Sequence, residues 1–375
     1  MDVWYNLKSK LKSKAMKTYI GLDAGHNNLK LVLQDEGQEN IEKVIMPSYI
    51  LLQESLFSKS SLKTPGLVRY LDGTREDLKN KAWLMGAAAI EANEKASVPL
   101  AAVADGNGKV EYCLHSLLSL LSNFPPREGW DIILSCSNHR ADVYGKVIKK
   151  SLEGWHKVSL AGKETLVNVT VADVVDEATH YKPKNSGGDV VLLDFGGGTS
   201  IFVKYSAQGI NVAREVVDVG VDDLINLIYD DKETYSLLHK DRSRHEIRKG
   251  LENSKGDRVF YGLEGRGGIE ITPIYIRNLK TWLSAYMKDI LSLTSKSLRA
   301  GATLQLIGGG SLLPNLEDIL TAILTRGGKE AHTINKVTKI ALWANSLALL
   351  ELSKAYKIKN FSKSKISLVS VRVAE

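Results

Sequence analysis

Two short segments of the chain place an aspartate beside glycines and hydroxyl or basic side chains. In residues 190–200, VVLLDFGGGTS, an apolar run ends at Asp194, and four candidate phosphate contacts follow: Gly196, Gly197, Gly198 and Thr199. Glycine lets backbone N–H groups face an anion with no Cβ in the way. An aspartate there suits hydrated Mg²⁺. The pattern predicts a phosphate-binding turn beside a metal, and the alternative is a Gly-rich hairpin that binds no ligand.

The same device occurs earlier, in residues 18–30, TYIGLDAGHNNLK. Here an apolar run ends at Asp23, and the candidate phosphate contacts are Gly25, His26, Asn27, Asn28 and Lys30. A lysine ammonium neutralises phosphate as a point charge. For His26 two readings stay open: the side chain donates to phosphate, or it faces solvent. Asp23 and Asp194 are the candidate metal ligands, each acting through water.

A third glycine cluster comes late, in residues 303–320, TLQLIGGGSLLPNLEDIL. It contains Gly308, Gly309 and Gly310 between an apolar run and a helical pattern. We expect the strand to run through these glycines into a helix, with Pro314 near its first turn. Three glycines without side chains would let the backbone pass close to a ligand.

In this order, the three segments resemble the nucleotide site of the actin, DnaK-type chaperone and sugar-kinase superfamily. The resemblance covers residues 17–355. The first-turn pattern D-x-G-x-x-N-x-K is close to plasmid-segregation actins of the ParM/StbA type, and the third segment also looks like MreB. The resemblance implies an α/β, two-lobed actin-like (RNase H-like) fold, with a duplicated core and a nucleotide cleft between the lobes.

The resemblance also implies the ligand and the roles of the site residues. The two turns would hold the phosphates of ATP, with GTP as the alternative nucleotide. The backbone of the third glycine cluster would lie close to the ribose and the base. Glu177, after a predicted strand, matches a glutamate that positions or deprotonates the attacking water; the alternative is an ordinary helix-start carboxylate. Residues 245–253 are expected to form a short helix, and either Arg248 or Lys249 on it would pack against adenine. The alternative is that this face of the helix is simply exposed to solvent.

Two positions depart from the superfamily pattern. His26 and Asn27 stand where small hydroxyl residues are usual, so the contact with the terminal phosphate and the rate of hydrolysis are in doubt. Ile201 replaces an acidic residue often found after the second turn, which leaves Asp194 as the carboxylate there.

The elements that must position these residues follow from periodicity and from the resemblance. Apolar, β-branched runs on both sides of each turn predict two hairpins. The segment 274–298 predicts one long amphipathic helix with its aromatic residues, Tyr286 included, in the core. We expect this organisation: a basic tail at 1–16; a first lobe at 17–185 with a small subdomain at 48–100; a second lobe at 186–335 with a small subdomain at 229–268; a helix at 336–356 returning to the first lobe; a basic tail at 357–375.

Composition narrows the class of protein. With 375 residues, 43% apolar and 25% charged, the chain has the size of two domains and the composition of a globular protein. No apolar run reaches the roughly 18–20 residues of a membrane-spanning helix, and no signal-peptide core begins the chain. Cys113 and Cys136 lack metal-site spacing, which indicates free thiols in a reducing cytoplasm.

The excess of positive charge lies in the two tails. Residues 1–17 carry five lysines and one aspartate, and residues 351–375 carry five lysines, one arginine and two glutamates. With a net charge of +7 for the chain, the body between them is close to neutral. The tails could contact DNA, an acidic protein or a membrane. The N-terminal tail can equally be a solvated segment, with Met16 as the true start.

The leading hypothesis is an ATPase that polymerises into helical filaments for plasmid or DNA segregation, coupled to DNA through an adaptor protein. The alternative is a non-polymerising sugar or acid kinase of the same superfamily, although no separate sugar motif is evident. A DnaK-type chaperone is disfavoured because no peptide-binding domain follows. Rossmann and P-loop folds are disfavoured because no G-x-G-x-x-G opens a helix after the first strand and no GK[ST] is present.

Overall fold

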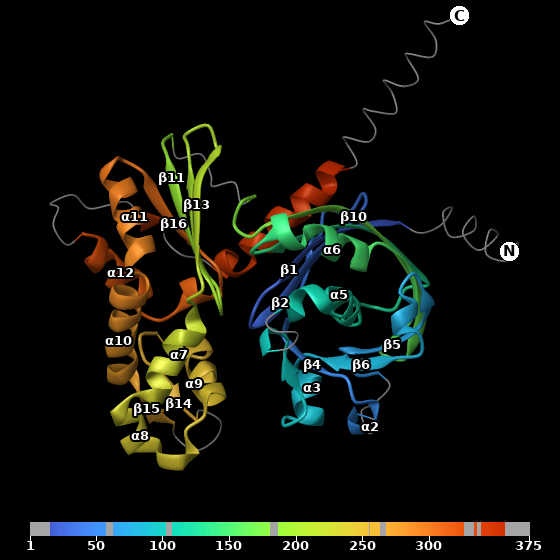
Figure 1. The fold of residues 1–375 in the computed structure, drawn as a ribbon, viewed down its shortest axis with the longest axis horizontal. Coiled ribbons are helices and arrows are strands. Elements are labelled where there is room, and N and C mark those ends of the chain that lie inside the picture. Colours follow the sequence, from blue (N-terminus) through green and yellow to red (C-terminus); the bar gives the residue numbers. More distant parts are fainter. Residues whose placement is uncertain are drawn as a thin grey trace, which may run out of the picture. The chain divides into compact units, whose positions relative to one another are not determined.

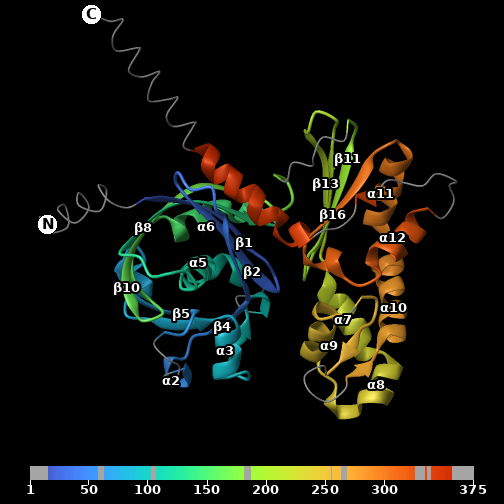
Figure 2. The same ribbon diagram turned by 180° about the vertical axis from the view of Figure 1, so that it is seen from behind.

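The computed structural model describes residues 16–57, 63–102, 107–180, 187–254, 256–262, 268–325, 334–335 and 339–356. The predictions for the tails at 1–15 and 357–375 lie outside these residues. The chain forms two compact units, Met1–His180 with Asn345–Glu375, and Tyr181–Ala344. Figures 1 and 2 show each unit from two sides.

Unit 1 is built on a ten-stranded sheet that curls around helix α5 (Cys113–Leu121) (Figure 1). Its strand order is β3-β2-β1-β8-β10-β9-β5-β6-β4-β7. The strands are β1 (Lys17–Ala24), β2 (Asn28–Asp35), β3 (Glu42–Pro47), β4 (Tyr49–Leu51), β5 (Leu67–Gly73), β6 (Ala82–Met85), β7 (Val98–Pro99), β8 (Gly129–Asn138), β9 (Gly154–Leu160) and β10 (Lys163–Asp176). All nine residues of α5 are buried, so the sheet encloses this helix as its core.

Unit 1 also contains the helices α3 (Ala87–Ala92), α4 (Gly108–Glu111) and α6 (Ala141–Leu152). A helix at 344–356 packs on the outer face of β1. A Cβ added at Gly21 would lie 2.1 Å from the carbonyl oxygen of Ser346, so glycine is required for this close approach. Ser353 Oγ donates to the carbonyl of Ile20 at 2.6 Å, which fixes the helix along the strand.

Unit 2 has a five-stranded sheet in the order β13-β12-β11-β16-β17. Its strands are β11 (Val190–Phe195), β12 (Ser200–Tyr205), β13 (Asn211–Val217), β16 (Thr303–Ile307) and β17 (Ile334–Asn335). Helices α11 (Lys288–Arg299) and α12 (Leu316–Leu324) lie beside this sheet, and α10 (Thr272–Thr281) lies beside α7 (Val221–Asp230) (Figure 1). A smaller region holds α7 (Val221–Asp230), α8 (Lys232–Leu238), α9 (Arg244–Glu252), β14 (Phe260–Tyr261) and β15 (Ile269–Glu270).

The two sheets share one topology. The segment β3-β2-β1-β8-β10 of unit 1 and the sheet β13-β12-β11-β16-β17 of unit 2 both follow the order 3-2-1-4-5. In each, the first three strands are antiparallel neighbours and the last two are added in parallel. The predicted α/β fold with a duplicated core is therefore confirmed, as are the two hairpins β1–β2 and β11–β12.

The predicted single helix at 274–298 is wrong. A π-helical turn, Trp282–Tyr286, separates α10 from α11. The extra residue of this turn changes the phase of the helix, so that Trp282 and Met287, five residues apart, are both buried, whereas Tyr286 is 46% exposed. Trp282 is fully buried against Phe195, with ring centroids 5.6 Å apart. Packing of this tryptophan into the core, rather than helical periodicity, decides the local geometry.

Both cysteines are free and buried in the described structure. Burial raises the pKa of the Cys113 and Cys136 thiols, which disfavours the reactive thiolate. No helix among the described residues is long and apolar enough to span a bilayer.

Candidate functional site

The first turn joins β1 to β2 and holds a buried ion pair at its base. Asp23 and Lys30 face each other in the antiparallel register, and Lys30 Nζ donates to Asp23 Oδ2 at 3.2 Å. A Cβ at Gly25 would lie 2.5 Å from the carbonyl oxygen of Asn28, so the turn is too tight for another residue. Ser48 Oγ donates to the carbonyl of Gly25 at 2.8 Å and holds the turn from the next strand pair.

The remaining predicted residues of this turn, His26, Asn27 and Asn28, are half-buried. The backbone carbonyl of Asn27 accepts from the N–H of Ser48 at 2.9 Å. The turn is thus preformed on its own unit. Whether its members contact phosphate stays a prediction.

The second turn joins β11 to β12 and repeats this geometry. The N–H of Gly196 donates to the carbonyl of Thr199 at 2.9 Å, and a Cβ at Gly196 would lie 2.8 Å from that oxygen. The carbonyls of Gly196 and Gly197 accept from the first N–H groups of α7, those of Val221 and Asp222, at 3.0 and 2.9 Å. These bonds turn the two carbonyls toward the helix.

The N–H groups of Gly197 and Gly198 make no hydrogen bond within the part of the chain that the structure describes. Backbone polar groups seldom stay unsatisfied, and successive N–H groups in a turn form an anion-binding concavity. The second turn therefore has the donors that a phosphate oxygen requires. Asp194 stands at the end of β11, directly before it, and is buried.

The third glycine cluster lies against the second turn. Strands β11 and β16 run in parallel with Asp194 opposite Ile307. Gly308 has φ +83°, and a Cβ there would lie 2.2 Å from Asp194 Oδ1 and 2.6 Å from the carbonyl oxygen of Phe195. Gly310 is equally tight, with its Cβ position 2.8 Å from Cβ of Phe195, whereas a Cβ at Gly309 would make only an ordinary contact, 3.6 Å from Cδ1 of Leu342. Two of the three glycines are thus required by contact with the second turn.

The expected helix follows β16 with Pro314 near its first turn, but the strand does not run into it directly. A 3₁₀ turn, Gly309–Leu312, follows the strand, and α12 begins only at Leu316. Pro314 therefore precedes the helix. Since proline has no N–H and restricts the residue before it, it separates the two helical segments.

We predict that Gly308→Ala disrupts the second half of the site. The added methyl group would meet the Asp194 carboxylate, and alanine tolerates φ +83° poorly. We expect at least a tenfold loss of ATP affinity in titration calorimetry. Gly301→Ala is the matched control, because Gly301 has φ +91° but nothing within 4 Å of its Cβ position. Equal effects of both variants would mean that backbone strain alone is responsible.

Glu177 lies at the carboxyl end of β10 in unit 1 and is buried. Its N–H donates to the carbonyl of Asn138 at 3.2 Å, at the end of the neighbouring strand β8. The next residue, Ala178, has φ +65°, a left-handed conformation that is uncommon outside glycine. No helix begins within residues 177–180, so the alternative of a helix-start carboxylate is wrong. Its role toward water stays a prediction.

Solved structures share this fold. The chain superposes on Bacillus thuringiensis ParM with ATP at a TM-score of 0.60 and 16% identity, over 91% of this chain and 99% of that one. The actin-like protein Alp7A gives 0.65 and 15%, over 93% and 98%. Ta0583, an archaeal actin homologue, gives 0.64 and 16%, over 90% and 99%. The chain has the actin-like fold of ParM-type proteins. No protein-family model and no curated protein sequence matches it.

Within this ParM-type fold, the two candidates for adenine contact differ. Arg248 Nη2 donates to Asp222 Oδ1 at 2.6 Å, and Asp222 in turn bonds the second turn through its N–H. Lys249 pairs with Glu246 of its own helix, and its side chain is 41% exposed. Arg248 therefore lies on the side of α9 toward the second turn, and contact with adenine stays a prediction for it.

Two further residues of unit 1, which the sequence analysis did not identify, lie beside predicted site residues. Lys109 Nζ lies 3.8 Å from Oε1 of Glu177. Ser137 is opposite Asp23 in the register of β1 and β8, and its Oγ is buried without a partner among the described residues. Both stand far from the motifs along the chain, so only the strand register and the packing of α4 could reveal them.

Each unit has an aspartate whose chemistry suits Mg²⁺ held through water, and the role of these residues as metal ligands stays a prediction. Among the described residues, no three histidine, cysteine, aspartate or glutamate side chains are close enough to bind a metal directly. Each unit instead contributes one aspartate beside a phosphate-type turn, Asp23 and Asp194. Mg²⁺ keeps several waters and commonly binds one or two carboxylates together with phosphate oxygens.

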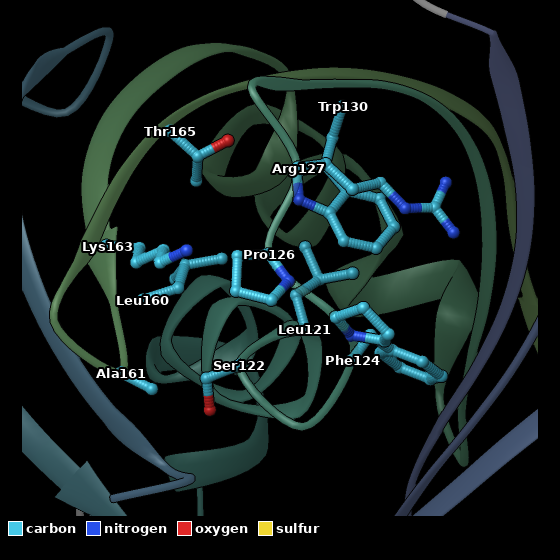
Figure 3. Close-up of a pocket in the computed structure, with 11 residues that line it drawn as sticks. Leu121, Ser122, Phe124, Pro126, Arg127, Trp130, Leu160, Ala161, Lys163 and Thr165 are labelled. Carbon is cyan, nitrogen blue, oxygen red and sulfur yellow. The ribbon is translucent and has the colours of Figure 1, made fainter. Parts of the chain in front are cut away.

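A pocket in unit 1 is separate from these turns. It lies where β8 and β10 begin, at the other end of the strands from Asp23 and Glu177, and is lined by Leu121, Phe124, Pro126, Trp130, Leu160 and Thr165 (Figure 3). Its volume of about 30 Å³ has room for no more than a few water molecules. This pocket is too small for a nucleotide.

Proposed function

We propose that the chain binds Mg²⁺–ATP, hydrolyses it and polymerises into filaments. The observation that carries ATP binding is the repetition of one device on the two copies of the core. In both, a buried aspartate ends the central strand and a turn without room for a Cβ follows. The neighbour with ATP bound, Bacillus thuringiensis ParM, has the same fold and supports the assignment.

In this proposal each residue has a defined role. The turns at Gly25–Asn28 and Gly196–Thr199 bind the phosphates, and Lys30 neutralises part of their charge. Asp23 and Asp194 order the metal through water, and the glycines at 308–310 leave room for ribose and base. Glu177 orients the attacking water, so that catalysis is mainly positioning and electrostatics. GTP remains the alternative nucleotide.

Polymerisation is proposed from the resemblance to plasmid-segregation actins and from the actin-like fold. Head-to-tail contacts between identical subunits do not close and therefore generate open helical strands. Unit 2 offers apolar contact area in its smaller region, where Tyr235 and Leu237 of α8 are 53% and 49% exposed. The role in plasmid or DNA segregation in the cytoplasm belongs to the same proposal, with the basic tails available to an adaptor protein, DNA or a membrane.

We predict that the purified chain forms filaments with ATP or AMPPNP above a critical concentration, and far fewer with ADP. ATP favours the polymerising conformation only if it binds that conformation more tightly. Sedimentation and electron microscopy at tens of micromolar protein measure this. A chain that stays monomeric with every nucleotide, yet phosphorylates a small metabolite, would replace the filament proposal by the kinase alternative.

A further inference from the structure

Lys109 forms a contact that the proposed chemistry has not yet used. Its Nζ lies 3.8 Å from Oε1 of Glu177, and the two side chains are only 13% and 9% exposed. The Lys109 ammonium makes no hydrogen bond to any residue that the structure describes. A charge withdrawn from water requires a paired charge and hydrogen bonds. Glu177 supplies the charge, and the donors of Lys109 remain available.

The backbone of Glu177 is held in place from both sides. Its N–H is bonded to the carbonyl of Asn138, and the left-handed conformation of Ala178 turns the chain immediately afterwards. Such a conformation in a non-glycine residue persists only where the surroundings impose it. With the backbone fixed, the position of the carboxylate depends on its side-chain torsions, and the ammonium of Lys109 restricts these.

Ser137, at the same end of the sheet as Glu177, has a hydroxyl group without a hydrogen-bond partner among the described residues. Its Oγ is buried and unbonded, on the strand between β1 with Asp23 and β10 with Glu177. A buried hydroxyl without a partner is unfavourable in a folded protein. The unused donors of Ser137 and Lys109 therefore both indicate that oxygen atoms of a ligand or of water belong there.

We propose that Lys109 is a positioning residue that acts through Glu177. The ammonium holds the Glu177 carboxylate in the orientation from which it can direct a water molecule. The inference rests on the proposed ATP hydrolysis, in which Glu177 orients the nucleophile. The distance of 3.8 Å is at the outer limit of an ion pair and beyond hydrogen-bond length, so the ammonium restrains the carboxylate through its charge.

The first test replaces Lys109 by methionine, which keeps much of the length and apolar packing of the stem. Small misplacements of catalytic groups can cost about 10²-fold in rate. We expect kcat for ATP hydrolysis to fall about 10- to 100-fold, with KM for ATP changed much less. Lys109→Arg, which retains the positive charge, should recover most of the loss. Lys157→Met is the matched control, since Lys157 forms an exposed ion pair with Glu164 at 3.2 Å.

The second test is a double-mutant cycle with Glu177→Gln. If Lys109 acts through Glu177, adding Lys109→Met to that variant should lower kcat no further. Multiplicative losses would overturn the inference, because Lys109 would then act independently of Glu177. Thermal unfolding of each variant identifies a loss that arises from misfolding, and failure of Lys109→Arg to recover activity would also contradict the proposal.

The outcomes separate this inference from the proposed function. A wild-type chain that neither binds nor hydrolyses ATP overturns the proposed function, and the inference with it. A wild-type chain with ATPase activity that Lys109→Met leaves unchanged overturns the inference alone.

Discussion

Asp194→Ala is expected to abolish Mg²⁺-dependent ATP binding and hydrolysis. Asp194 is buried near the end of β11, with Phe195 between it and the glycines of the second turn, and the Cβ position of Gly308 lies 2.2 Å from its Oδ1. Its partner across the hairpin is Ile201, so that strand offers no second carboxylate at this level. Removing the carboxylate therefore removes the group that we propose orders the metal in unit 2. Titration calorimetry with Mg²⁺–ATP and a phosphate-release assay measure the two losses.

The control for this prediction is Asp189→Ala. Asp189 precedes the same strand but lies at its other end, where it forms a partly exposed ion pair with Lys204 at 2.9 Å. Exposed pairs contribute roughly 0–1 kcal/mol to stability. We expect this variant to bind and hydrolyse ATP like the wild type. If Asp194→Ala retains wild-type affinity and turnover as well, the site assignment is wrong.

Glu177→Ala is expected to bind ATP normally and to hydrolyse it much more slowly. A positioned general base commonly contributes about 10²–10⁴-fold to the rate. Glu177 lies on the segment after β10, outside both phosphate turns, so we expect its removal to leave the phosphate contacts in place. Filaments formed with ATP should then persist, because nucleotide hydrolysis no longer weakens them. Single-turnover phosphate release and the lifetime of sedimentable filaments measure these effects.

Glu177→Ala also removes the charge that pairs with Lys109, which leaves an ammonium only 13% exposed without its partner. This loss can lower stability by itself. Glu177→Gln keeps the volume and the capacity to accept a hydrogen bond, so it separates catalysis from folding. Glu153→Ala, which breaks an exposed pair with Lys149 on α6, is the control for loss of a surface carboxylate. Unchanged phosphate release in both Glu177 variants would exclude a catalytic role.

The sequence by itself determined the parts of this protein that depend on neighbouring residues. An apolar strand, an aspartate, glycines and a second apolar strand specify a hairpin with a tight turn, because strand alternation and glycine conformation are local properties. Both hairpins are present, as β1–β2 and β11–β12. The repetition of this pattern also indicated the duplicated core, since two copies of one local device imply two copies of the sheet that carries it.

Only the tertiary structure decided which distant residues meet. The contact of Gly308 with Asp194 depends on the parallel register of β16 and β11, and the pairing of Lys109 with Glu177 depends on where a four-residue helix packs. The π-helical turn at Trp282 likewise follows from the core that surrounds it. Register and packing are set by the burial of whole faces, summed over many side chains far apart along the chain. No single segment of the sequence contains that information.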